Sequence, residues 1–430
     1  MQNPVTEKTL SNGLKIILKE IHTAPLISQW IWYRVGSRDE TPGITGISHW
    51  VEHMQFRGTP RFPQGVIDRA ISRDGGFWNA LTFLDWTTFF ETMPSDKIEL
   101  ALQVEADRMT NSLFAPQDVE LERHVIISER QGNENEPLFR LSEEVQATAF
   151  QVHAYHHEVI GDLVDLEKIE RDELYGHYRK YYHPGNAVLT IAGDFRTDEL
   201  LDTINNYFGT IPAGGIPSRN HCSEPSQSEE RKVALEGPGD TIYLQIAFHA
   251  PEVTHPDFFS LVILDSLLSG ASSLNMFGGG MSNKTSRLYG AVVEKDLAVS
   301  LQSVLHATKD PFLNTIVAII HPASRIENVI EAIDAEIMQL LTTPPERAAL
   351  DRAVKQARAI FAYGSERVTN QAFWLGLSEM VATHDWLNSF HENLQAVSSE
   401  DVQRVAQKYL CSRNRTVGVY IPTENNKESA

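Results

Sequence analysis

Two histidines and a glutamate lie within five residues of one another, in the stretch HWVEH at positions 49–53. If this stretch is helical, at about 100° per residue, His49 and His53 lie about 40° apart and Glu52 lies about 60° from His49 on the other side. All three side chains then share one helix face. Imidazole and carboxylate groups bind zinc, so the stretch is either a metal site or a solvent-exposed turn of ordinary helix.

The opposite face of this predicted helix is apolar. It carries Ile44, Ile47, Val51 and Met54. Such a helix can pack one stripe into a core while the other stripe presents its side chains to a cleft. The pattern therefore favours the metal site over the exposed turn.

A third metal ligand has to come from elsewhere, because a catalytic zinc usually has three protein ligands and one open position for water. The segment ELERHVIISERQGNENEP, residues 120–137, offers Glu122 and Glu129, which are seven positions apart and within about 20° on a helix face. Either glutamate could face the metal, and their spacing does not choose between them. The order H-x-x-E-H is that of the inverted zincin motif, in which the inner glutamate, here Glu52, is the expected general base.

Composition excludes several other classes of function. The chain has 430 residues, of which 42% are hydrophobic, a formal net charge of −20 and a pI of about 5.2. Nucleic acids and anionic membrane surfaces attract basic proteins, so neither is an expected partner. Two cysteines, Cys222 and Cys411, cannot build a cysteine-rich zinc module, so any zinc must be held by histidine and carboxylate.

The sequence also predicts no membrane span, since no run of about 18 apolar residues occurs. The first residues, MQNPVTEKTL, lack the charged and apolar regions of a secretory signal. We therefore expect a soluble protein, which is cytoplasmic or, if a presequence has been removed, periplasmic or organellar.

Strand and helix patterns surround the motif. VTEKTL and LKIILKE form two predicted strands around the hairpin turn Asn12-Gly13, and a further strand over about 26–35 leads to the predicted helix with HWVEH. Residues 166–193 read as a helix, a tyrosine-rich turn and a buried strand. The motif is therefore expected on a helix that follows the third strand.

The second half of the chain repeats this organisation. At a constant offset of 228, Tyr181 matches Tyr409 and Asn186 matches Asn414, and residues 240–270 mirror the strand and helix of the first half. The repeat predicts an α+β fold of two tandem homologous domains, each a mainly antiparallel sheet packed with helices. The predicted boundaries are 1–213 for an N-terminal zinc-binding domain, 214–231 for a linker, and 232–430 for a C-terminal domain without the metal motif.

A second histidine cluster occurs in HAYHHEVIG, residues 153–161. It contains His153, His156 and His157, but no carboxylate pair at ligand spacing lies nearby. We therefore expect a structural or exposed role for these histidines rather than a second metal site.

Further motifs resemble those of the pitrilysin/insulinase family of zinc peptidases (peptidase family M16), particularly its short, mitochondrial-processing-peptidase-like class. HWVEH matches the family's H-x-x-E-H, and the other matching stretches are SNGLKIILKE, VGSRDETPGITGISH, RGTPRFP, GGFWNALTFLDWTTFF, VEADRM and YYHPGNAVLTIAGDF. They cover most of residues 5–195, and a thinner likeness persists in SRLYGAVVEKDLAVS. The resemblance implies the same duplicated α+β fold, forming half of a clamshell.

The resemblance also implies a role for each residue of the site. The family's third ligand is a glutamate about 76 residues beyond the second histidine, which here is Glu129. One zinc ion per chain is then held by His49, His53 and Glu129. Glu52 is the expected catalytic base, and Glu122 is expected to support catalysis.

A substrate strand is implied in the same way. In relatives, the strand that corresponds to WNALTFL is an edge strand, along which an extended peptide adds by backbone hydrogen bonds. Position by position this implies substrate binding by Asn79, Ala80 and Thr82. Asn79 could equally be a turn residue, but strand addition would explain how such enzymes bind varied peptides.

One departure from the family pattern lies in the second half. Complete sites in the family use an arginine and a tyrosine there to bind substrate and stabilise the tetrahedral intermediate, whereas VVEKDLAV has Val293 and Val299 at these positions. We therefore expect a paralogous partner subunit to supply both groups in a heterodimer, with a homodimer as the second option. The expected function is that of a zinc metalloendopeptidase acting on peptides or unstructured polypeptide segments; the alternative is a non-catalytic peptide-binding or assembly subunit.

Overall fold

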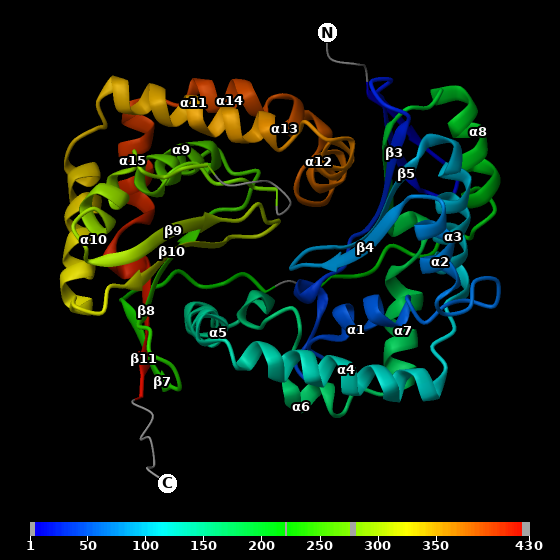
Figure 1. Cartoon of the computed structure of the whole chain (residues 1–430), viewed down its shortest axis with the longest axis horizontal. Coiled ribbons are helices and arrows are strands. Elements are labelled where there is room, and N and C mark those ends of the chain that lie inside the picture. Colours follow the sequence, from blue (N-terminus) through cyan, green and yellow to red (C-terminus); the bar gives the residue numbers. More distant parts are fainter. Residues whose placement is uncertain (1–4, 220–221, 276–280, 424–430) are drawn as a thin grey trace. The chain divides into compact units, whose positions relative to one another are not determined.

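The computed structural model of the chain describes residues 5–219, 222–275 and 281–423. Its first sheet contains six strands (Figure 1). Its strands are β1 (Val5–Thr9), β2 (Lys15–Glu20), β3 (Leu26–Tyr33), β4 (Phe77–Thr82), β5 (Thr87–Pro94) and β6 (Ala187–Gly193). Their order across the sheet is β1-β2-β6-β3-β5-β4, and every pair except β2 with β6 is antiparallel. The predicted hairpin at Asn12-Gly13 is confirmed, because β1 and β2 pair around this turn.

The second sheet repeats this order with five strands in the described part of the chain. They are β7 (Arg231–Gly237), β8 (Tyr243–Ala250), β9 (Ala298–Leu305), β10 (Phe312–Ile320) and β11 (Arg415–Pro422). Their order is β7-β11-β8-β10-β9, which matches β2-β6-β3-β5-β4, and the parallel pair again joins the first two strands, β7 and β11. The predicted α+β class and duplicated, mainly antiparallel organisation are confirmed.

The repeated helix–turn–strand unit explains the offset of 228 in the sequence. Helix α7 (Arg171–Tyr181) leads into β6, and helix α15 (Ser399–Tyr409) leads into β11. In each turn an asparagine side chain donates to the carbonyl of the last helical tyrosine: Asn186 to Tyr181 at 2.9 Å, and Asn414 to Tyr409 at 2.8 Å. This bond satisfies a carbonyl that the helix end leaves free, so tyrosine and asparagine recur together.

The described residues form two compact units that do not follow the predicted boundaries at 213 and 232. Unit 1 comprises Met1–Gln131, His157–Cys222 and Ser365–Leu387, and unit 2 comprises Gly132–His156, Ser223–Gly364 and Asn388–Ala430. Helix α5 (Pro137–Ala149) belongs to unit 2 because it packs on β7, β8 and β11. Helix α12 (Val368–Val381) belongs to unit 1 because it packs on β3 and β6.

The predicted linker, residues 214–231, contains no helix or strand in its described part until β7 begins at Arg231. Its residues 220 and 221 lie outside the described residues. The local structure of this segment agrees with a linker. The predicted domain boundaries differ from the compact units in two segments, the one that contains α5 and the one that contains α12, and they stay a prediction.

In unit 1 the sheet lies between α12 on one face and several helices on the other (Figure 1). Trp30 and Trp32 of β3 meet Phe373 of α12 at ring-centroid distances of 5.3 and 5.4 Å. The remaining helices that lie wholly or mainly in this unit are α1 (Ile47–Met54), α2 (Val66–Arg73), α3 (Ile98–Asn111), α4 (Pro116–Glu134), α6 (Leu163–Leu166), α7, α8 (Thr197–Phe208) and α13 (His384–Asn388).

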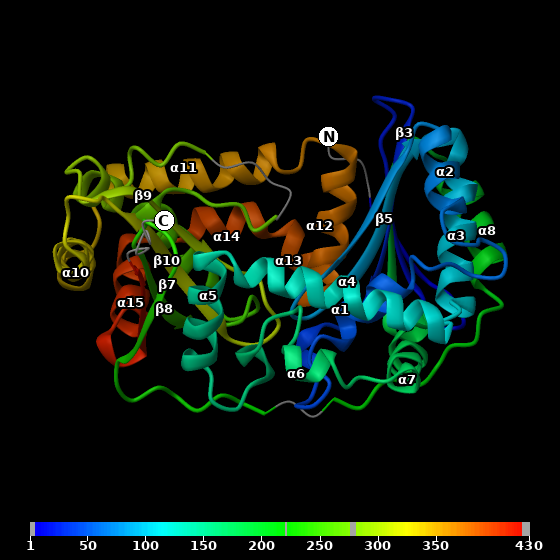
Figure 2. The same ribbon diagram turned by 60° about the horizontal axis from the view of Figure 1, so that its bottom comes forward.

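Unit 2 has α5 against one part of its sheet and a second group of helices around the rest (Figure 2). That group comprises α9 (Phe258–Ser269), α10 (Ile326–Thr342), α11 (Arg347–Tyr363), α14 (Phe390–Ala396) and α15. None of the described helices is long and apolar enough to cross a membrane.

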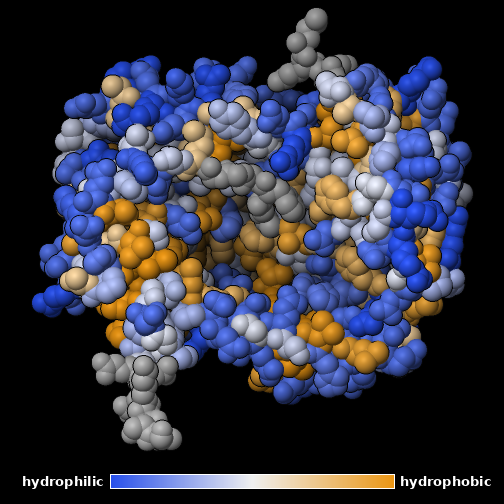
Figure 3. All heavy atoms as spheres, viewed as in Figure 1, coloured by the Kyte–Doolittle hydropathy of each residue, from blue (hydrophilic) through white to orange (hydrophobic). Residues whose placement is uncertain are grey.

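Apolar side chains also reach the surface of unit 1 over α4 and α6 (Figure 3). Leu121 and Val125 of α4 and Val164 of α6 are each about half exposed. Leu121 and Val125 lie on the outer side of α4, whereas Glu122 and Ile126 of the same helix are buried. Helix α4 therefore has an inner face on which a site can be built.

Candidate metal centre

Helix α1 anchors the H-x-x-E-H stretch in the core of unit 1. Ile47, Val51 and Met54 are buried, as the apolar stripe of the sequence predicts. His49 and His53 are half-buried on the other side of the helix, with ring centroids 4.6 Å apart. The helix therefore fixes both imidazoles on one face.

The start of α1 is held by residues outside the motif. Gly46 has a φ of 84°, and a side chain there would collide with the Ile160 carbonyl oxygen. The Glu40 carboxylate accepts hydrogen bonds from the backbone N–H groups of Gly46 and Ser48 at 2.8 and 2.9 Å, and His157 Nε2 lies 3.0 Å from it. A carboxylate at this position satisfies free N–H groups and interacts favourably with the helix dipole. Sequence analysis missed Glu40, for which the only signal is an acidic residue just before a glycine-rich helix start.

His49, His53 and Glu129 come together because α4 passes beside α1 (Figures 1 and 2). One ligand atom from each residue lies within 4.8 Å of the others, and His53 Nε2 is 3.7 Å from a Glu129 carboxylate oxygen. In the part of the chain that the structure describes, this is the one group of three or more such side chains that could hold a metal ion.

The protonation and hydrogen bonding of His49 fit a metal ligand. Burial, assisted by the charge of His53, lowers the pKa of His49 to about 3, so its imidazole is neutral and free to bind a metal. Among the described residues, His49 Nδ1 is buried without a hydrogen-bond partner. Buried polar atoms rarely stay unsatisfied, so the donor set fits a zinc ion held by two imidazoles and one carboxylate.

Glu122 and Glu129 are distinguished by their partners. Glu122 is buried, accepts a hydrogen bond from Arg57 Nε, and lies 3.2 Å from His53 Nδ1. Burial tends to raise the pKa of Glu122, but the hydrogen bond with His53 and the charge of Arg57 outweigh it and lower the pKa. His53 thus uses Nδ1 for Glu122, which leaves Nε2 toward Glu129. Arg57 was missed by sequence analysis, because it lies beyond the end of α1 at Met54, in the turn that follows the helix.

Glu52 lies between the two histidines in sequence but points to the sheet. It is 7% exposed, and Thr82 Oγ1 donates a hydrogen bond of 2.6 Å to its carboxylate. Burial raises the pKa of Glu52 to about 7, although the hydrogen bond from Thr82 acts in the opposite direction. A buried carboxyl group that titrates near neutral pH is suited to accept and release a proton.

Strand β4, which carries the predicted substrate residues, pairs with β5 on one side and is the last strand of its sheet in the described part of the chain. Asn79 is exposed on this strand, which makes it a strand residue rather than a turn residue. Ala80 is 9% exposed and Thr82 is 6% exposed. The free edge agrees with strand addition, but the side chain of Thr82 is directed to Glu52.

The histidines of residues 153–161 have structural partners, as expected. His153 Nε2 lies 3.1 Å from Asp310, His156 Nδ1 lies 3.1 Å from the carbonyl oxygen of His153, and His157 lies 3.0 Å from Glu40. These imidazoles form no metal-binding group within the described residues. His157 nevertheless contributes to the centre, because it helps to hold the carboxylate at the start of α1.

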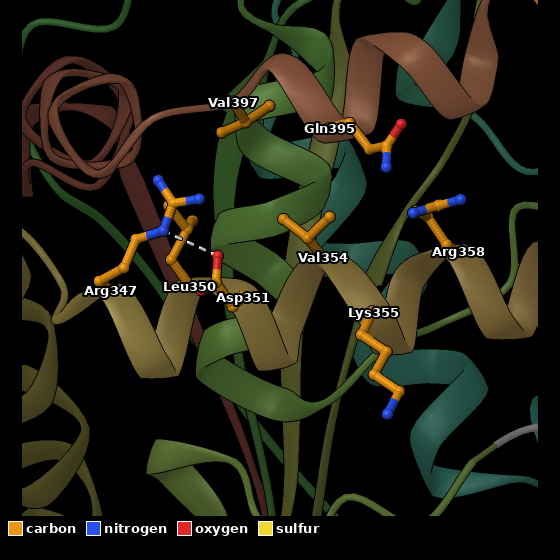
Figure 4. A pocket seen from close by; sticks show the side chains of 8 residues that line it. All are labelled: Arg347, Leu350, Asp351, Val354, Lys355, Arg358, Gln395 and Val397. Atoms are coloured by element: carbon orange, nitrogen blue, oxygen red, sulfur yellow. Dashed lines mark ion pairs between the residues drawn. The ribbon is translucent and has the colours of Figure 1, made fainter.

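A separate pocket of about 470 Å³ lies between α11 and the end of α14 in unit 2 (Figure 4). Leu350, Val354 and Val397 form its apolar part, and Arg347 and Asp351 pair at 2.9 Å at one end. It contains no predicted site residue and no histidine. Its one carboxylate, that of Asp351, is paired with Arg347, and the pocket is separate from the predicted site.

The chain belongs to peptidase family M16. The family model described as "Insulinase (Peptidase family M16)" matches residues 15–163, and the model described as "Peptidase M16 inactive domain" matches residues 168–357. The resemblance to this family found in the sequence is thereby confirmed.

Relatives extend along almost the whole chain. "Uncharacterized zinc protease YmxG" of Bacillus subtilis (strain 168) is 26% identical, covering 97% of this chain and 98% of its own. "Mitochondrial-processing peptidase subunit beta" of Lentinula edodes is also 26% identical, covering 97% and 90%. The crystal structure of a protease from Helicobacter pylori superposes with a TM-score of 0.91 over 98% of this chain and 100% of that chain, at 24% identity. The relatives support a zinc peptidase, and the structural neighbour confirms the fold.

Proposed function

We propose that this chain is a zinc-dependent endopeptidase that hydrolyses peptides or unstructured polypeptide segments. The observation that carries the proposal is the convergence of His49, His53 and Glu129 within 4.8 Å, next to the buried carboxylate of Glu52. Zinc proteases among the relatives support the choice of metal. One such ligand group among the described residues supports one zinc ion per chain.

Each residue of the group has a distinct task in this proposal. Zinc held by the two histidines and Glu129 would acidify a water molecule and polarise the scissile carbonyl group. Glu52 takes the proton of the water and passes it to the leaving amine. Glu122 holds the ring of His53 through Nδ1, which fixes the tautomer that presents Nε2 to the metal.

Peptide binding is assigned to the free edge of β4. An extended peptide adds there by backbone hydrogen bonds, and Asn79 and Ala80 lie along that edge. Beside the strand, a pocket of about 360 Å³ is lined by Phe56, Ile67 and Trp78 among others, and it can take an apolar side chain of the peptide. Backbone pairing with one side-chain pocket suits a peptidase that accepts varied, unfolded segments.

A partner subunit is proposed to complete the site. Val293 ends the short π-helix Tyr289–Val293, and Val299 is exposed on β9. Neither side chain can donate a hydrogen bond to the negative charge that develops on the substrate carbonyl oxygen. The partner is a paralogue that supplies an arginine and a tyrosine, or a second copy of this chain; the word "subunit" in the names of several relatives supports the former.

Two substitutions test the peptidase directly. Glu52→Gln removes the base but no metal ligand. The protein purified together with its partner subunit should therefore retain its zinc, measured by mass spectrometry of metals, and lose most of its turnover of an unstructured peptide. His53→Ala removes a ligand and should lose the zinc itself. Full zinc content in His53→Ala, or unchanged turnover in Glu52→Gln, would contradict these roles.

The alternative remains a non-catalytic subunit that binds peptides or supports assembly. One observation bears on it, namely that the second family model is described as an inactive domain. Against it, a protein without catalysis gains nothing from two buried or half-buried imidazoles and a buried carboxylate left without a metal. Peptide binding without product formation, at full zinc occupancy, would favour this alternative.

A further inference from the structure

Thr82 and Thr87 form a short chain of hydroxyl groups that ends on Glu52. Thr82 Oγ1 donates to the Glu52 carboxylate at 2.6 Å and lies 3.3 Å from Thr87 Oγ1. Thr87 Oγ1 donates in turn to the backbone carbonyl of Val35 at 2.9 Å. The two threonines are directly opposite each other on β4 and β5 and are both buried. The sheet therefore fixes these hydroxyl groups away from solvent.

We propose that Thr82 is a positioning residue, supported by Thr87, that holds the Glu52 carboxyl group in the orientation needed for proton transfer. The inference rests on the proposed function, and it assigns the Thr82 side chain a role other than the substrate binding that the family resemblance implies for this residue. The side chain of Thr82 donates its hydrogen bond to Glu52, so a peptide that pairs with β4 would contact the backbone of Thr82 rather than its side chain.

The chain of hydroxyl groups suits a base that changes its charge. A hydroxyl group donates one proton and accepts through two lone pairs. Here the hydroxyl group of Thr82 donates to the Glu52 carboxylate, and that of Thr87 donates to the Val35 carbonyl oxygen. Neither hydroxyl proton is therefore directed along the contact between the two hydroxyl oxygens. Once Glu52 holds the proton taken from water, it can donate to Thr82, and Thr82 can turn its own proton to Thr87. Glu52 thus stays hydrogen-bonded before and after the transfer.

The location of Thr82 also links the base to the substrate strand. Thr82 is the last residue of β4, and the peptide is proposed to pair along the free edge of that strand. The base and the peptide backbone are then supported by one element, which keeps the distance between them constant. Small errors in such distances cost large factors in rate.

The experiment measures kcat and KM for an unstructured peptide in Thr82→Val and Thr82→Ser, using the full chain with any subunit that copurifies with it. Valine keeps the β-branched shape and removes the hydroxyl group, so kcat should fall about 10- to 100-fold with zinc content and KM unchanged. Serine keeps the hydroxyl group and should restore most of kcat. Thr88→Val is the matched control, because Thr88 is a buried neighbour whose hydroxyl group donates to Ile31 rather than toward the site.

Each other outcome has a definite meaning. If Thr82→Val raises KM and leaves kcat unchanged, the side chain binds substrate and the positioning role is wrong. If Thr82→Val and Thr88→Val lose kcat equally, or if serine does not rescue, the effect is general damage to the sheet and the inference fails. If the wild-type protein with its zinc and its copurifying subunit has no turnover, the proposed function fails first, and this inference falls with it.

Discussion

At the scale of single residues, the two glutamates of α4 are separated by their partners, which supports the proposed roles of Glu129 as a ligand and Glu122 as a support. Their spacing of seven places both on one helix face, so the sequence could not choose between them without the family resemblance. The two glutamates differ in their contacts, because Glu122 accepts a hydrogen bond from Arg57 and lies beside His53 Nδ1. These partners lie outside α4, so the residue pattern within α4 could not distinguish the two glutamates.

This separation predicts two different losses of zinc affinity. Glu122→Gln should weaken zinc binding about 10- to 100-fold, because His53 loses the acceptor that fixes its tautomer. Glu129→Gln removes a ligand and should weaken it further. The measurement is a competition with a chromogenic chelator, which requires no turnover.

Glu120→Gln serves as the matched control for both glutamates. Glu120 lies on the same helix, but it is exposed and pairs with Arg123. Its substitution should leave zinc affinity unchanged. Equal affinities for Glu122→Gln and wild type would refute the support role of Glu122.

At the scale of elements, the free edge of β4 makes a prediction about the peptide backbone. Consecutive residues of an extended peptide point their N–H groups alternately toward and away from the neighbouring strand. Two peptides of the same sequence, N-methylated at alternate positions, should therefore differ. The peptide whose methylated N–H groups point toward β4 should show a KM that is about 10-fold higher or more, and the peptide methylated at the other positions should show little change in KM.

The contrast between the two series is the informative measurement. If both methylated series bind equally well, the peptide is held by its side chains and β4 does not act as a pairing strand. If both lose binding equally, the methyl groups act through their size alone. Either result would remove Asn79 and Ala80 from the substrate site.

The sequence predicted the elements better than it predicted their assembly. The hairpin at Asn12-Gly13 and the repeated asparagine turns follow local rules, and both occur where expected. The placement of α5 and α12 was not predictable in this way. An apolar helix face can cover either sheet, and the choice depends on contacts between residues far apart in sequence.

At the scale of the whole molecule, the missing arginine and tyrosine predict that this chain depends on a partner. The isolated chain with its zinc should have little turnover, and addition of the copurifying subunit should raise kcat/KM by about 100-fold or more, since an oxyanion donor is worth that much. The assay compares the isolated chain with the reconstituted complex. Light scattering after gel filtration then distinguishes a paralogue from a second copy.

Robust turnover by a monomeric chain, abolished by a chelator, would contradict the need for a partner. In that case the negative charge of the intermediate must be stabilised by groups within this chain. Val293 and Val299 could not be those groups. The composition agrees with either result, since a net charge of −20 argues against a nucleic-acid partner but does not distinguish one protein partner from another.

The assignment of α12 to unit 1 has a consequence for biosynthesis. A ribosome makes the chain from its N-terminus, so all strands of the sheet that supports α1 have been made when β6 ends at Gly193. The face of this sheet that carries Trp30 and Trp32 is covered by α12, and α12 is made only later, as residues 368–381. Throughout that interval a large aromatic surface has no permanent cover. The packing of this sheet that the structure shows is therefore complete only after α12 in the second half has been made.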